Sequence, residues 1–491
     1  MTVDAPVPDR ADRAEVTAAL VALHHAFEDL VVRGLESSGP GDVQRLEAIG
    51  EELGRAGASF VAGKIAEVVR RVRASDPGAA RALLQAQTTT RVLERVLSLD
   101  AALESLGGTP GEPAAPPART PPAVDSAALV PVLEELAALA EGLVASGMTT
   151  ASAATKAKLD ATFKEASRMK LLRLAASLRY VGDELTRFLA DSEQFSPRRL
   201  AFFLNRTWLI SRGLLDAIQK KDSAALARLL WSAAPTPVAR LTLVVIGVQK
   251  RSLLDGSAAF EFRMRVAAAA GAVPQGARLA WSCVFGAKKG VPAEAFLHLP
   301  QAQKFMPKIL LDPTEIVVTD AAVVLDEHGA GRLMLGPKST VKPGAKLKTW
   351  DAWQAWDPAA AAARIRRHPI SPLDLEVELH EEVTLVDWTI GAPTETDARP
   401  DHVVYPVTAG GRTFDAIATR GADGAALRDA LEVFRKPKAK RPPLFGLVHY
   451  EMARLVLQPL AVFRDAGPDF LMIATDKIDL ASLMKTLDFT H

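Results

Sequence analysis

Apolar residues recur at three- and four-residue steps through the first 231 residues, and at two-residue steps after about residue 235. The first period is typical of amphipathic helices and the second of half-buried strands. Leu20, Leu23, Phe27 and Leu30 fall on one helical face, and this helix is expected to end near Gly34. In the first unit the pattern predicts helices over 14–34, 43–55, 60–73 and 77–106.

The stretch 30–72 recurs at a constant offset as 143–185. Identical pairs are Leu30/Leu143, Val31/Val144, Gly34/Gly147, Leu46/Leu159, Ala48/Ala161, Glu52/Glu165, Arg55/Arg168, Ala62/Ala175 and Val68/Val181. This self-similarity predicts an internal duplication of a helical unit. The second copy is expected to contain helices over 129–146, 151–168, 171–189, 197–218 and 223–231. Its last long helix, with Phe202 and Phe203, is more aromatic than its counterpart.

A segment dense in Pro, Gly and Ala (107–122) separates the two copies. It has no apolar periodicity, which is typical of a semi-extended linker. The predicted organisation is a first helical copy over 1–107, a linker over 108–125, a second copy over 126–234 and a β-rich domain over 235–491. The β-rich domain is expected to divide near 350–375 if it contains two subdomains.

The β-rich half alternates short apolar-polar runs with turn residues, which predicts an antiparallel sandwich or barrel. Expected strands are 240–248, 258–266, 277–285, 315–319, 321–325, 333–335, 375–390, 402–406, 412–418 and 444–463. Expected helices are 350–367, 425–434 and 480–487. The predicted fold class is therefore α+β multidomain, with tandem duplicated all-α bundles followed by an antiparallel β-rich half.

Composition restricts the protein class more than it identifies a function. A length of 491 residues with 48% hydrophobic and 24% charged residues is typical of a globular chain of two to four domains. The chain has no apolar run long enough for a membrane helix, and its first residues lack a signal-peptide pattern. A single cysteine excludes internal disulfides and multi-cysteine metal sites. These features predict a cytoplasmic bacterial protein with no membrane partner.

The net charge of +1 conceals opposite charges on the two copies. Residues 1–107 contain 12 Lys and Arg against 16 Asp and Glu, a balance of −4, whereas residues 126–234 contain 15 against 11, a balance of +4. The copies are thus expected to attract each other, or the second is expected to face an acidic partner.

Chemical motifs yield no catalytic, cofactor-binding or metal-binding assignment. Cys283 alternates with Trp281 and Phe285 on a predicted strand, which favours a buried structural thiol. Glu376, Glu378, His380 and Glu382 share one strand face, but ligands along one strand do not converge, so a solvated sheet face is expected.

Three tryptophans, Trp350, Trp353 and Trp356, follow one another at three-residue steps on a predicted helix. An exposed stripe of this kind is typical of a protein-binding surface, and a buried one docks the helix on the sheet; docking is favoured.

Two basic clusters are candidate contacts for phosphates or for an acidic partner. The first is the loop Arg435, Lys436, Lys438, Lys440 and Arg441, and the second comprises Arg364, Arg366 and Arg367. Aromatic residues do not interleave with the loop, so base stacking is not indicated. The alternative for the loop is a solvated connection before the strand at Leu444.

Three functions remain open on the sequence alone. The leading hypothesis is a non-enzymatic interaction protein, an adaptor or scaffold subunit of a bacterial multi-protein system, with other proteins as partners. The alternatives are a nucleic-acid-associated protein that uses the basic second unit and the 435–441 loop, and an enzyme or metal-binding protein with its site in the β-rich half. No cofactor is predicted.

Overall fold

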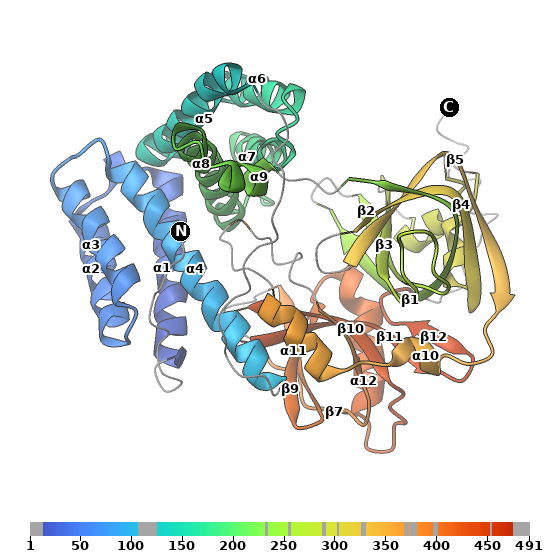
Figure 1. Ribbon diagram of the computed structural model, residues 1–491. Helices are drawn as coiled ribbons and strands as arrows, with labels where there is room; N and C mark the ends of the chain where they lie inside the picture. The colour runs from blue at the N-terminus through green and yellow to red at the C-terminus, as the bar shows by residue number, and fades with distance from the viewer. Residues whose placement is uncertain are drawn as a thin grey trace.

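The computed structural model describes residues 13–106, 125–230, 234–253, 257–286, 291–301, 304–325, 330–367, 373, 381–395, 401–451 and 454–474. Helices make up the N-terminal part and sheets dominate the C-terminal part, so the predicted α+β class is confirmed (Figure 1). The predicted linker over 108–125, with the exception of Asp125, and the predicted helix 480–487 lie outside the described residues.

Nine α-helices follow the predicted pattern in the described part of the N-terminal region. They are α1 (Arg13–Arg33), α2 (Pro40–Arg55), α3 (Ser59–Arg73), α4 (Ala79–Ser105), α5 (Ser126–Ser146), α6 (Ala153–Arg168), α7 (Leu172–Leu189), α8 (Pro197–Gln219) and α9 (Ser223–Leu230). The first residues of α1 and α5, of α2 and α6, and of α3 and α7 are each 113 positions apart. Short 3-10 turns, η1 (Leu35–Ser37) and η2 (Met148–Thr150), keep the same offset.

The two helical units share one hydrophobic core. Leu20 and Leu23 of α1, Leu84 of α4 and Leu133 of α5 are fully buried members of a single cluster. Several apolar pairs at this offset are buried in both copies, as with Leu46 and Leu159 and with Val68 and Val181. The conserved pattern thus specifies interior packing, whereas the exposed positions are free to differ.

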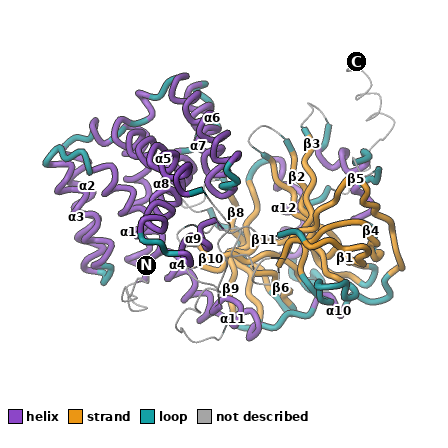
Figure 2. The backbone as a smooth tube through the Cα atoms, turned by 45° about the horizontal axis from the view of Figure 1, so that its top comes forward, coloured by secondary structure: helices purple, strands orange, loops and turns teal. Residues whose placement is uncertain are grey.

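Helix α4 belongs to both halves of the molecule. Its first turns pack in the helical core, whereas Leu99 and Leu103 belong to the core of the β-rich half. The guanidinium of Arg412 donates from Nε to the carbonyl oxygen of Ser105 over 2.5 Å and thereby binds the last turn of the helix. In Figures 1 and 2, α4 runs from the helical layers to the edge of the sheets.

The first strand system is a closed five-stranded barrel. Its strands are β1 (Thr236–Ser252), β2 (Ala258–Val266), β3 (Arg278–Phe285), β4 (Thr314–Leu325) and β5 (Ala330–Lys346), in the order β1-β2-β3-β5-β4. Strand β4 pairs back to β1, and β3 and β5 are parallel. This order is that of an OB-fold. Inside it, Phe260 and Phe262 are fully buried, and Phe262 packs on Trp281 with ring centroids 5.6 Å apart.

The second strand system has the order β6-β10-β11-β9-β8-β7, with β12 paired to β11. Its strands are β6 (Glu381–Leu385), β7 (Thr389–Ile390), β8 (His402–Ala409), β9 (Arg412–Thr419), β10 (Leu444–Glu451), β11 (Arg454–Arg464) and β12 (Gly467–Phe470). Strands β6 and β7 are separated by three residues only, so one bent segment serves both edges of the sheet. The sheet repeats the strand order of the barrel: the β6–β7 segment, β8, β9, β10 and β11 correspond to β1, β2, β3, β4 and β5. Strands β9 and β11 form the parallel pair, and α12 (Ala425–Arg435) is inserted between β9 and β10.

Several predicted elements differ in detail from the observed ones. The two expected strands 315–319 and 321–325 are one strand, because a bulge at Asp320 (φ 51°) lets pairing with β5 continue. The expected strand 444–463 is the β10–β11 hairpin. The expectation of a wholly antiparallel sheet was wrong at β3–β5 and β9–β11. The expected helix 350–367 is split into α10 (Asp351–Gln354) and α11 (Pro358–Arg367), since Pro358 starts a new helix.

The two strand systems pack against each other through one continuous apolar cluster. Gly247 of β1 lies against Phe445 and Leu460, and a β-carbon at this glycine would lie under 3.0 Å from the Phe445 ring. Nearby, Lys250 Nζ forms ion pairs with Glu294 (2.9 Å) and Asp423 (3.7 Å). Glycine at position 247 therefore allows the close approach of the barrel to the second strand system.

Candidate functional site

The predicted basic loop is anchored at both ends and open in the middle. Arg435 pairs with Glu432 (2.5 Å), and the Nε of Arg441 donates to the carbonyl of Phe434 (3.0 Å). Lys436, Lys438 and Lys440 are exposed. The three lysines form ion pairs with no described residue, which is compatible with a solvated loop and with a partner contact.

The second predicted basic cluster, on α11, lies apart from this loop. Arg364 pairs with Glu381 (2.5 Å), and Glu381 lies opposite Val448 in the β6–β10 pair. The loop ends just before Leu444, which lies opposite Leu385 at the other end of β6. About 13 Å of strand separates these positions, so the structure does not bring the two clusters together at one point. Arg366 is partly buried, and the side chain of Arg367 is outside the described part.

The tryptophan stripe packs against the β-rich core. Trp350 is only 4% exposed and lies 6.2 Å from the Phe463 ring, centroid to centroid. Trp353 and Trp356 are partly buried against the same core. The favoured interpretation, in which the stripe docks this segment on the sheet, agrees with these contacts.

Cys283 is buried inside the barrel with Trp281, as the alternation predicted. Burial raises the pKa of the thiol to about 12. The thiol therefore remains protonated at neutral pH and is a poor nucleophile.

The expectation of a solvated face around Glu382 was wrong at that residue. The Glu382 carboxylate is buried and pairs with Arg265 and Arg263 of β2. The other members of the predicted face, Glu376, Glu378 and His380, lie outside the described residues. Within the described residues no group of three His, Cys, Asp or Glu side chains is arranged to hold a metal ion.

A group of arginines that the sequence did not predict lies on the outer side of the first barrel, partly covered by the second strand system: the side chains of Arg263, Arg265 and Arg278 are only 15–16% exposed. The cross-strand register places outward residues in rows: Arg265–Arg278–Ala330, then Gly247–Arg263–Ala280–Arg332, then Gln249–Glu261–Ser282, then Arg251–Ala259–Val284. Side chains in one row point to the same side of the sheet. This arginine face therefore combines Arg251, Arg263, Arg265, Arg278 and Arg332 with one glutamate and several small residues.

Two carboxylates of β6 compensate one end of the arginine face. Glu381 accepts hydrogen bonds from Arg278 (3.1 Å) and Arg364, and Glu382 pairs with Arg265. Burial alone raises the pKa of Glu382, but the charges of Arg265, Arg263 and Arg278 outweigh it and hold that pKa below its ordinary value. This end of the face is a buried ion-pair network that joins the barrel to the second strand system.

At the other end of the face the arginines outnumber the carboxylates. Arg251 and Arg263 share Glu261, which lies 3.6 Å from Arg251, and Arg263 also lies 3.8 Å from Glu382. The Nε groups of Arg251 and Arg263 are buried, and neither donates to any described residue. Burial lowers the pKa of Arg251; Glu261 opposes this, and the charges of Arg263 and Arg332 lower it further. Arg332 is exposed and forms an ion pair with no described residue. Buried donors without acceptors favour an anionic ligand at this end.

Part of this face is visible in the sequence of β2. Arg263 and Arg265 alternate with Phe262 and Met264 on β2, so an outward basic row was visible there. Arg251, Arg278 and Arg332 come from other strands, and only the register places them on the same surface.

Comparisons with known proteins give no family. No family model and no curated protein matches the chain. Solved structures that align include "Structural mimicry for functional antagonism" (TM-score 0.22, 7% identity, 46% of this chain and 92% of that chain), "Crystal structure of the tetrameric p202 HIN2" (0.20, 8%, 46% and 90%) and "Structure of murine DNA binding protein bound with ds DNA" (0.19, 11%, 46% and 93%). TM-scores this low do not establish a common fold.

Proposed function

We propose that the protein binds a single-stranded polyanion, namely the phosphate backbone of single-stranded nucleic acid, on the arginine face of its first barrel. The observation that carries the proposal is the arginine-rich end of this face, where Arg251 and Arg263 share one carboxylate, that of Glu261, and Arg332 is exposed. The face lies on strands 2 and 3 of a barrel with OB-fold order, the surface on which such barrels hold oligonucleotides. A fold alone does not determine function, so the charges carry the argument.

The described face favours backbone contacts over recognition of bases. Its outward positions between the arginines are small, as at Ala259, Ala280 and Ser282, and no aromatic side chain stands among them. Stacking platforms for bases are therefore absent from this face, and sequence-independent binding with strong salt dependence is expected.

Titration of a fluorescent oligothymidylate of about 20 nucleotides at several salt concentrations tests the proposal. The wild-type chain is expected to bind at low salt. Replacing Arg251 and Arg332 with alanine removes two phosphate contacts and is expected to reduce the slope of log K against log salt by about 1.4. Both side chains are at least a third exposed, so the fold is retained.

The basic loop provides a matched control. Lys436→Ala and Lys438→Ala, made together, remove the same charge from an exposed segment and are expected to leave binding unchanged. Binding lost through the loop variants and not through the barrel variants would assign the contact to the loop. Absence of binding by the wild-type chain at low salt would refute the proposed function altogether.

A second proposal is that the helical part serves as an adaptor or scaffold for other proteins. The equal helix offsets and the repeat support duplication of a helical unit whose copies now carry different surfaces. Helix α4, which has residues in both cores, connects this part to the β-rich half. Purification from the native source as an isolated monomer, without other proteins, would contradict the adaptor role.

A further inference from the structure

We infer that the exposed face of α7 docks an acidic, amphipathic segment of a partner protein. This surface, the α7 face, comprises Leu172, Arg173, Arg179 and Tyr180 together with a leucine-lined pocket at the start of the helix. Positions 172 and 179, and positions 173 and 180, are seven apart, so they lie on one side of α7 about two turns from each other.

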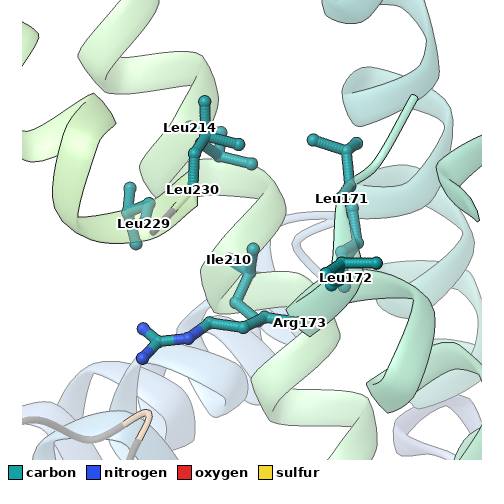
Figure 3. A pocket seen from close by; sticks show the side chains of 8 residues that line it. Leu171, Leu172, Arg173, Ile210, Leu214, Leu229 and Leu230 are labelled. Carbon is teal, nitrogen blue, oxygen red and sulfur yellow. The ribbon is translucent and has the colours of Figure 1, made fainter. Parts of the chain in front are cut away.

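The pocket supplies the apolar part of the docking surface. It is a shallow depression between the start of α7, α8 and α9, and it is lined by Leu171, Leu172, Arg173, Leu174, Ile210, Leu214, Leu229 and Leu230. Figure 3 shows Leu171 and Leu172 on one side and Leu229 and Leu230 on the other, with Ile210 between them. Leu172 is 59% exposed, an unusual exposure for a leucine beside an apolar pocket.

Two arginines supply the charge that selects the partner. Arg173 makes only one long contact, from Nη1 to the carbonyl oxygen of Arg228 (3.5 Å), and Arg179 lies over the Tyr180 ring at 5.4 Å. Neither arginine forms an ion pair with a described residue. Carboxylates spaced about two turns apart on a partner helix would meet both guanidinium groups.

A rigid aromatic stack fixes the middle of the face. The Tyr180 ring stacks on Phe203 of α8 (4.3 Å), Phe203 meets Phe202 edge-on (4.8 Å), and the Arg91 guanidinium covers Phe202 at 3.6 Å. Tyr180 nevertheless remains 36% exposed. Tyrosine and arginine held in this way are the residue types that dominate binding energy at protein interfaces.

The first helical unit lacks this surface at the corresponding positions. Glu67 stands where the second unit has Tyr180, and it pairs with Arg70 (2.7 Å) and Arg71 (2.5 Å). Ser59 and Ala66 take the places of Leu172 and Arg179. The position that corresponds to Arg173 holds Phe60, which is 40% exposed and has Lys64 Nζ 5.9 Å from its ring centroid. The first unit therefore lacks Arg173, Arg179 and Tyr180 at the matching positions, but it exposes one large apolar side chain of its own.

Two designed helical peptides of about 18 residues test the inference on the full-length chain. They share the same leucine stripe, and one carries Glu and the other Lys at the polar positions. A Tyr180→Trp variant reports binding at the face through its fluorescence. The acidic peptide is expected to bind at least about tenfold more tightly than the basic one.

Charge reversal distinguishes a docking surface from general stickiness. The double variant Arg173→Glu, Arg179→Glu is expected to reverse the preference, and Leu172→Asp is expected to weaken both peptides. The matched control Arg55→Glu, Lys64→Glu makes the same charge change on the first unit and is expected to retain the wild-type preference. Equal binding of the two peptides, no binding of either, or the same effect from the control would overturn the inference.

Discussion

Gly34 and Gly147, which directly follow α1 and α5, meet backbone to backbone. A β-carbon on Gly34 would lie under 3.0 Å from the carbonyl of Ser146, and one on Gly147 equally close to the carbonyl of Arg33. Both have positive φ angles, 87° and 77°. Each glycine ends a helix in its own unit and contacts the other unit, so the contact is reciprocal.

Gly34→Ala and Gly147→Ala are therefore expected to destabilise the helical part strongly. Strain at positive φ costs about 1–3 kcal/mol, and forced overpacking adds about 1–3 kcal/mol. The double variant is expected to cost less than both single variants together, since the residues share one contact. Urea unfolding measures these effects. Gly63→Ala, on an open face of α3, is the control and is expected to stabilise by up to about 1 kcal/mol; equal effects at positions 34 and 63 would contradict the packing described.

The pair His24–Glu94 is expected to make stability depend on acid pH. Burial raises the pKa of Glu94, but the hydrogen bond and charge of His24, with Arg91 and Arg95, lower it to about 2 from 4.5. Because the folded pKa is the lower one, this stabilisation is complete above about pH 4.5 and is lost as the pH falls toward 2. Glu94→Gln is expected to cost about 1.5–3 kcal/mol at pH 7.

Denaturant titrations between pH 7 and pH 2.5 measure this dependence. The difference between wild type and Glu94→Gln is expected to shrink at the acid end, whereas the exposed control Glu36→Gln is expected to follow wild type throughout. A constant difference across the range would show that the Glu94 carboxylate does not contribute through its charge.

The Cys283 thiol is expected to resist modification in the folded chain. With its pKa raised to about 12 by burial, it should react with a disulfide reagent at pH 8 only after unfolding. The variant Cys283→Ser, Ser282→Cys moves the single thiol to the exposed neighbouring position and is expected to react rapidly. Fast labelling of the folded wild-type chain would contradict burial inside the barrel.

Trp350→Ala is expected to destabilise the β-rich half by about 3–5 kcal/mol, because the ring fills space against Phe463 and Gly467. Trp353→Ala, at a partly buried position of the same stripe, is expected to cost less. Thermal unfolding of the two variants provides the measurement. An unchanged midpoint for Trp350→Ala would favour the binding-surface interpretation over docking.

Local patterns predicted the elements better than their assembly. The alternation of Phe260, Phe262 and Met264 predicted β2 with the observed bounds. The burial of Glu382 was not predicted, because the arginines that pair with its carboxylate lie more than 100 positions away in sequence. The arginine face and the α7 face likewise depend on register and packing between distant segments, which periodicity does not encode.

Helix α4 has a consequence for how two ligands would be held at once. Its 27 residues extend about 40 Å, and its ends are embedded in different cores. A single-stranded nucleic acid bound to the first barrel and a partner protein bound to α7 would then be held at a fixed distance from each other. A flexible linker in place of α4 would let that distance vary. The protein would therefore place the partner at a set distance from the nucleic-acid site.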